Sequence, residues 1–157
     1  MKKLFAIIIT LLMTFVISSC GNEPQHSDNH TVTLKTTEGR RDITIKFEHD
    51  GDDITKLYQK EIISFESLGV DNASDAQTLL DSKAAAIPTV DGYENKIKVT
   101  EKHVVETIEI NFKNIKPDKV DEIPGLNFIG GPGKNISLEK SIKELKKSGF
   151  AEVEEKK

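Results

Sequence analysis

Short segments that alternate apolar and polar residues, joined by glycine-containing turns, place the strongest limit on how this chain can fold. Thr31–Leu34 and Ile43–Phe47 alternate with the period of two that is typical of a half-buried strand. Gly39 and Gly51 follow such segments, and glycine accepts the positive φ that a tight hairpin needs. The pattern therefore predicts antiparallel hairpins.

The same pattern continues through the middle of the chain. Ile54–Phe65 reads as a long strand, and the broken alternation at Leu57-Tyr58 and Ile62-Ile63 predicts a bulge. Residues 93–99 and 104–112 form a second alternating pair around a tight turn. No alternation of strands and helices of the parallel type is present, which argues against a nucleotide-binding crevice.

Two segments have the signals of principal helices. Ser74-Asp75-Ala76-Gln77 is a capping-box pattern that predicts a helix continuing to Ala86 and ending before Pro88. Ser137 is a second predicted cap, and Gly149 suits the left-handed position of a Schellman stop.

Leu138, Ile142 and Leu145 form one apolar stripe on the second predicted helix. A short helix is also expected from Pro117 to Val120. We therefore expect an α+β single domain, in which an antiparallel β meander carries two main helices packed on one face.

The N-terminal segment has the pattern of a lipoprotein export signal. Lys2 and Lys3 precede the apolar run Leu4–Ile17, which at about fourteen residues is shorter than the roughly twenty needed to span a bilayer. Small residues and an aliphatic residue three positions before Cys20 predict cleavage after residue 19 and a lipid-modified Cys20. Cys20 is the only cysteine, so it has no partner for a disulfide.

This leader divides the chain. We expect a signal peptide over residues 1–19, the lipidated cysteine and a flexible tether over 20–29, a folded domain over 30–153 and a polar tail over 154–157. The predicted location is extracytoplasmic, with lipid on Cys20 holding the domain at the outer face of a bacterial cell membrane.

Charge narrows the choice of partners. The chain has 22 basic and 26 acidic side chains, and loss of Lys2 and Lys3 with the leader leaves 22 − 2 = 20 basic, a formal charge of 20 − 26 = −6. Nucleic-acid binding normally requires clustered positive charge, so it is not expected. The predicted membrane contact is the lipid on Cys20 alone, and an envelope protein or polymer is the predicted ligand class.

A glycine-rich loop resembles a phosphate-binding loop without matching it. Gly130–Lys134 precedes a predicted helix, but a P-loop would need glycine at Phe128 and Ser or Thr at Asn135. We read the loop as a rigid connection to the Ser137 cap. No nucleotide or other cofactor is predicted.

Candidate metal ligands are equally incomplete. Asp50-Gly51-Asp52-Asp53 groups carboxylates, but an EF-hand needs glycine at the place of Thr55. His26 and His30 lie beside Asp28 in the predicted tether, where ordering the chain opposes binding. No metal site is predicted.

No catalytic constellation is visible either. A Gly-x-Ser-x-Gly elbow is missing, and the side chains of Ser82-Lys83 point apart on a helix. His49 and His103 stand beside predicted turns and are expected to be surface residues. We therefore predict that the protein is not an enzyme, with no catalytic, cofactor-binding or metal-ligating residue.

Several segments together resemble a known family. Ser64–Val70, Val104–Ile110, Ile123–Leu126 and Ser141–Phe150 are similar in order and spacing to the YehR-like family of small bacterial lipoproteins. The resemblance spans roughly residues 30 to 153, while the loop Gly131-Pro132-Gly133 is more glycine-rich than the family pattern. It implies export, lipidation and one α+β domain of unknown function, and it implies no site residues.

Three functional hypotheses follow. The first is a noncatalytic binding or interaction module of the envelope, which an exposed cluster of Phe128 and Ile129 would favour. The second is an envelope hydrolase with an unfamiliar site, which requires a cleft with a base and its partner. The third is an accessory to metal or solute uptake, which predicts that divalent ions stabilise the domain.

Overall fold

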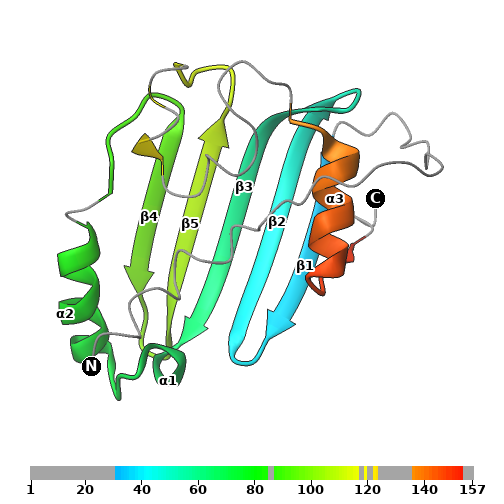
Figure 1. Ribbon diagram of the computed structural model, residues 1–157. Helices are drawn as coiled ribbons and strands as arrows, with labels where there is room; N and C mark the ends of the chain where they lie inside the picture. Colours follow the sequence, from blue (N-terminus) through cyan, green and yellow to red (C-terminus); the bar gives the residue numbers. More distant parts are fainter. Residues whose placement is uncertain (1–30, 85–86, 117–118, 120–121, 124–135, 154–157) are drawn as a thin grey trace.

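The computed structural model of the protein describes residues 31–84, 87–116, 119, 122–123 and 136–153. One sheet with helices against it accounts for most of these residues (Figure 1). Its elements in chain order are β1 (Thr31–Glu38), β2 (Arg41–Asp50), β3 (Asp53–Ser64), α1 (Phe65–Leu68), α2 (Ala73–Ala84), β4 (Tyr93–Val99), β5 (His103–Asn111), α3 (Leu138–Lys147) and β6 (Ala151–Glu152).

The sheet has six strands in the order β4-β5-β3-β2-β1-β6, and every neighbouring pair is antiparallel. Strands β1, β2 and β3 form the predicted meander. α1 and α2 then carry the chain from the end of β3 to the outer edge, so β4 becomes that edge strand and β5 returns beside β3. The expected antiparallel α+β fold is confirmed, with the second hairpin inserted in reversed order.

The predicted bulge in β3 lies at a different residue. His49 pairs with Ile54 and Glu48 pairs with Lys56, so Thr55 is the extra residue. The alternation at Ile62-Ile63 looks broken in the sequence because the neighbouring core position is occupied by a charged residue, whereas the backbone pairing there is regular.

The start of α2 also differs from the prediction. Asn72, not Ser74, caps the helix: the Asp75 amide donates to Oδ1 of Asn72 at 3.0 Å, and Nδ2 of Asn72 donates to Oδ2 of Asp75 at 2.9 Å. Asparagine accepts from the backbone at this position as well as serine does, so the pattern matched the wrong residue by two positions.

Helix α3 is built as predicted. Oγ of Ser137 accepts the amide of Lys140, and the amide of Phe150 donates to the carbonyl of Leu145 at 3.0 Å. Gly149 has φ of 87°, the left-handed conformation that this Schellman stop requires. The stop turns the chain into β6, which pairs with β1.

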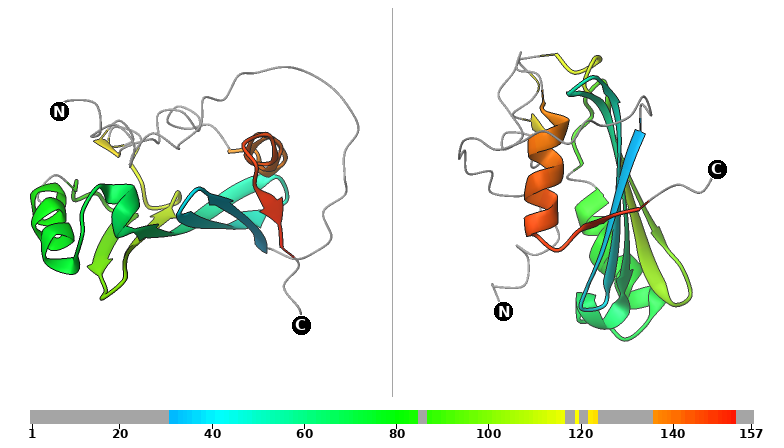
Figure 2. Two further views of the ribbon diagram at one scale, coloured as in Figure 1. Left: turned by 90° about the horizontal axis from the view of Figure 1, so that it is seen from below. Right: turned by 90° about the vertical axis from the view of Figure 1, so that its right-hand side faces the viewer.

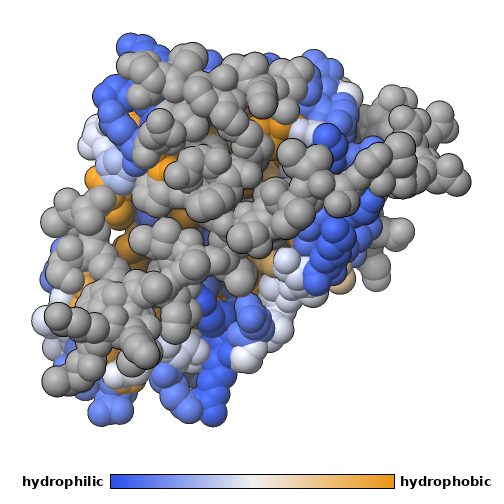
Figure 3. Space-filling view, in the orientation of Figure 1, coloured by the Kyte–Doolittle hydropathy of each residue, from blue (hydrophilic) through white to orange (hydrophobic). Residues whose placement is uncertain are grey.

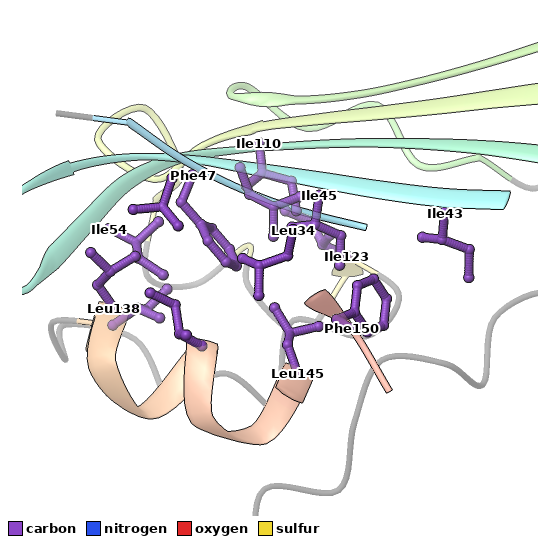
Figure 4. Packing of buried hydrophobic residues seen from close by; sticks show 14 of the residues in the cluster. Leu34, Ile43, Ile45, Phe47, Ile54, Ile110, Ile123, Leu138, Leu145 and Phe150 are labelled. Atoms are coloured by element: carbon purple, nitrogen blue, oxygen red, sulfur yellow. The ribbon is translucent and has the colours of Figure 1, made fainter. Parts of the chain in front are cut away.

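The apolar side chains of the fold form two clusters. Figure 2 shows that α3 covers one face of the sheet. The larger cluster lies under α3 and joins side chains of all the central strands, including Leu34, Phe47, Ile110, Leu138 and Leu145 (Figure 4). The smaller cluster joins Ile63 and Val104 to Ala76 and Leu80 of α2. α3 turns hydrophilic side chains outward (Figure 3).

Several predicted segments lie outside the described residues: the leader, Cys20 and the tether, the loop Gly130–Lys134, the pair Phe128 and Ile129, and most of the short helix expected from Pro117. Within the described part of the chain, no helix is long and apolar enough to cross a membrane.

Candidate functional site

A row of polar side chains runs across the covered face of the sheet. It consists of Arg41 on β2, Glu61 on β3, Glu106 on β5 and Asn95 on β4, and we call it the buried polar row. Glu61 and Glu106 are direct partners in the β3–β5 register. Only 3% of Glu61 and 8% of Glu106 is exposed, so both carboxyl groups lie inside the protein.

Each carboxylate of the row has a partner. Nη2 of Arg41 lies 2.6 Å from Oε1 of Glu61 in a buried ion pair. Nδ2 of Asn95 donates to Oε1 of Glu106 at 2.8 Å. The row thus holds one cation, which pairs with Glu61, and two carboxylates on adjacent strands, and the amide on Glu106 neutralises no charge.

The row divides the core. Along β5, Ile108 and Ile110 belong with the larger cluster, Val104 belongs to the smaller one, and Glu106 lies between them. The same order occurs along β3, where Glu61 lies between Leu57 and Ile63. The two halves of the core are therefore joined across a line of charge and not by continuous apolar packing.

Burial dominates the electrostatics of the row. Desolvation raises the pKa of Glu61, the charge of Glu106 raises it further, and the attraction of Arg41 is too weak to reverse the shift. Burial likewise raises the pKa of Tyr93, whose hydroxyl lies 3.5 Å from Nδ2 of Asn95. The arrangement can hold a proton on Glu61, but it presents little carboxylate surface to a reactant.

The opposite face of the sheet is open to solvent, and Figure 2 shows α3 on the other side. Strand register places one continuous line of alternating lysine and threonine across it, which we call the lysine row: Lys35, Thr44, Lys60, Thr107 and Lys96. All three lysines are exposed and the two threonines are half-buried.

Lysines and acids are equal in number on this open face, but three of the lysines share the lysine row, which contains no acid. Six lysines (35, 46, 56, 60, 96 and 98) and six acids (42, 48, 50, 53, 94 and 109) alternate onto it, a net charge of 6 − 6 = 0. The whole chain has a formal charge of −4. The open face as a whole is thus neutral on an acidic protein, and the lysine row is a line of positive charge across it.

Two of these lysines are already paired. Nζ of Lys56 lies 2.8 Å from Glu48 and Nζ of Lys96 lies 2.7 Å from Glu94. These hydrogen bonds raise the pKa of both lysines. By contrast, Lys35, Lys60 and Lys98 form no ion pair within the ranges that the structure describes.

The predicted turn of carboxylates after β2 serves the fold. Oδ1 of Asp52 accepts the amide of Glu139 at 2.8 Å, and the carbonyl of Asp52 accepts the amide of Leu138 at 2.7 Å. Asp52 thereby caps α3 from a distant turn. Across the described residues, no group of three or more histidine, cysteine or acidic side chains could hold a metal ion.

The histidine prediction is wrong for one residue. His49 is buried, with Nδ1 2.8 Å from the carbonyl oxygen of Gly51, because β2 places it on the core-facing side. His103 is half-buried at the start of β5. His26, His30 and Cys20 lie outside the described residues.

Sequence reasoning missed the buried polar row and the lysine row. Glu61 and Glu106 occupy core-facing positions of their strands, where a period-two pattern predicts apolar residues. The signal that could have revealed the buried polar row was a charged residue at a strand position where the alternation predicts a core-facing side chain. The sequence contains no signal for the lysine row, because its members come together only through the pairing of five strands.

Comparison with known proteins supplies the family. Residues 30–151 match the family described as "Protein of unknown function (DUF1307)". The chain belongs to the DUF1307 family. This agrees with the resemblance to YehR-like lipoproteins and with the one-domain α+β fold.

Two full-length relatives extend the comparison of this DUF1307 protein. The chain is 28% identical over 153 residues to "Uncharacterized lipoprotein Lmo0207" of Listeria monocytogenes, covering 98% of this chain and 97% of the relative. It is 23% identical over 154 residues to "Uncharacterized lipoprotein Lin0239" of Listeria innocua, with the same coverage.

Two solved structures have the same fold as this DUF1307 protein. The NMR structure of Escherichia coli YehR matches with a TM-score of 0.65 at 22% identity, over 82% of this chain and 93% of YehR. The NMR structure of a Streptococcus pneumoniae protein matches with a TM-score of 0.55 at 15% identity, over 90% of this chain and 96% of that protein.

Proposed function

We propose that this protein is a noncatalytic binding module, tethered through lipid on Cys20 to the outer face of a bacterial cell membrane, and that it contacts its ligand through the open face. One observation carries the binding role: five strands present a solvent-exposed surface crossed by the lysine row, in which Lys35 and Lys60 have no ion-pair partner within the described residues.

The anchor is supported by sequence and by relatives. Ile17-Ser18-Ser19-Cys20 ends an apolar leader, and Cys20 is the sole cysteine of the chain. Both Listeria relatives carry the name lipoprotein and align over 98% of this chain, which includes most of the leader.

We base the proposed absence of catalysis on the pairing and the burial of the two carboxylates in the buried polar row. Glu61 is paired with Arg41, and Glu106 accepts from Asn95. A general acid or base must come within hydrogen-bond reach of the substrate, and these groups are almost fully enclosed.

Cellular fractionation and intact mass measurement of the full chain test the anchor. The wild type is expected in the membrane fraction, with the leader removed and diacylglycerol on Cys20. Cys20→Ser should lose the lipid mass and the membrane association, whereas Asn22→Ser, a control two residues away, should keep both. An unmodified Cys20 thiol in the wild type would refute the anchor.

A hydrolase is the second candidate, favoured by the facing pair Glu61 and Glu106, because burial raises the pKa of Glu61 and two carboxyl groups in different environments are a common acid–base arrangement. The full chain should be assayed on ester, glycoside and peptide substrates. Turnover that is lost in Glu106→Gln and kept in Glu109→Gln, an exposed residue of the open face, would establish this candidate and refute the noncatalytic role.

A further inference from the structure

The geometry of the open face points to a linear, phosphate-bearing polyanion as its ligand, lying along the lysine row across the strands. This inference rests on the proposed binding function and names its partner class. The row is Lys35, Thr44, Lys60, Thr107 and Lys96, contributed by β1, β2, β3, β5 and β4 in that spatial order.

The lysines are regularly spaced along the lysine row. Neighbouring strands lie about 4.8 Å apart, so lysines on alternate strands recur about every 10 Å and the row extends about 20 Å. Each gap between lysines holds one threonine. Such a regular line of positive charge matches a ligand whose negative charges also repeat along a line.

The positive charge of the lysine row is available to a ligand. Lys35 and Lys60 have no ion pair within the described part of the chain. Lys96 contacts Glu94, but both side chains are more than half exposed, and such surface pairs contribute little stability. All three ammonium groups can therefore turn to an incoming anion at low cost.

The lysine and threonine side chains of the row are hydrogen-bond donors that suit phosphate. An ammonium group binds phosphate as a point charge, and a threonine hydroxyl adds a neutral donor beside it. Oγ1 of Thr107 lies 3.4 Å from the carbonyl oxygen of Lys96, a long contact that the hydroxyl can exchange for a phosphate oxygen.

The shape of the charge favours a single strand over a membrane surface. A flat anionic bilayer would meet the whole open face, including its six acids, whereas a strand along the lysine row avoids the adjacent row that contains Glu109 and Glu94. Tyr58 is the one exposed large apolar residue on this face within the described strands, so little apolar surface is offered to lipid.

Binding of fluorescently labelled inorganic polyphosphate to the full lipidated chain, held in neutral detergent micelles, tests the inference. A plot of log affinity against log salt concentration should have a slope of about −2 if three lysines each neutralise one phosphate. Lys35→Gln, Lys60→Gln and Lys96→Gln combined should remove most of this slope and weaken binding about a hundredfold at low salt, at about fivefold per lysine.

A matched triple variant separates this site from general charge. Lys113→Gln, Lys140→Gln and Lys143→Gln change the net charge equally at exposed positions outside the lysine row, and should bind almost as the wild type does. Equal weakening of the two triple variants, or no binding by the wild type, would overturn the inference. Unchanged circular dichroism and unfolding midpoints would establish that both variants are folded.

Two further arms test the ligand class. Equally tight binding of polyglutamate would overturn the preference for phosphate. The full chain carrying Cys20→Ser should also be tested for flotation with anionic vesicles. If it floats with them, loses this binding when the three row lysines are changed, and does not bind polyphosphate, the open face would be assigned to a bilayer instead. A lipidated wild type that fails to bind polyphosphate refutes the inference alone, whereas an unmodified Cys20 refutes only the anchor.

Discussion

Glu61 on β3 lies directly opposite Glu106 on β5, both carboxyl groups are buried, and one cation, Arg41, pairs with Glu61. This pairing divides the apolar core into two clusters and places a charge-bearing row between them. Removing charges from water costs several kcal/mol for each ion, and the partner must compensate for it. The row is therefore the part of the core whose stability depends most on pH and on single substitutions.

The first prediction concerns the pH dependence of stability. Because burial raises the pKa of Glu61 above its ordinary value of 4.5, the folded state binds a proton more tightly than the unfolded state does. The stabilising contribution of Glu61 to the free energy of unfolding is fully present below the pKa that this group has in the unfolded state. It is lost as the pH rises through the pKa that the group has in the folded state.

Urea unfolding of the wild type and Glu61→Gln between about pH 4 and about pH 8 measures this linkage. The free energy of unfolding of the wild type, relative to that of Glu61→Gln, should increase as pH falls toward 4.5. Glu109→Gln, which removes an exposed carboxylate, should show no such trend. The prediction would be contradicted if the free energy of unfolding of the wild type, relative to that of Glu61→Gln, rose with pH.

The second prediction concerns the ion pair itself. Arg41→Met leaves the Glu61 carboxylate buried without its cation and should destabilise the protein by about 3–5 kcal/mol at neutral pH. The double variant Arg41→Met with Glu61→Met removes both charges and should recover most of that loss. A double-mutant cycle from chemical denaturation measures the coupling, and additive losses would show that the pair is not coupled.

The third prediction concerns the cap that joins the β2–β3 turn to α3. Asp52→Ala removes the acceptor of the Glu139 amide and should cost about 1 kcal/mol, as for other helix caps. Asp50→Ala in the same turn is the control, since Asp50 is exposed. Thermal unfolding of both variants measures the difference, and equal midpoints would exclude a capping role for the Asp52 side chain.

The fourth prediction concerns Gly92, which has φ of 85° and stands before β4. A Cβ atom there would lie 2.6 Å from the carbonyl oxygen of Asn111, so Gly92→Ala must displace backbone as well as adopt a left-handed conformation. Gly39→Ala has the conformational cost alone, about 1–2 kcal/mol, because nothing lies within 4 Å of its added Cβ. Gly92→Ala should be clearly the more destabilising of the two in denaturant titrations.

Local signals in the sequence predicted the elements whose stability is local. The β1–β2 and β2–β3 hairpins, the Ser137 cap and the Gly149 stop each depend on residues a few positions apart, and the structure contains all of them. The errors were local too: Asn72 competed with Ser74 as a cap, and the charge at Glu61 imitated a bulge.

The tertiary structure decided how these elements meet. The connection through α1 and α2 brings β5 beside β3, and this pairing alone makes Glu61 face Glu106. It also aligns Lys60 with Thr107 and Lys96, which completes the lysine row. No short-range pattern encodes such neighbours, because residues some 45 positions apart become adjacent only when strand order and register are set by burial of the shared core.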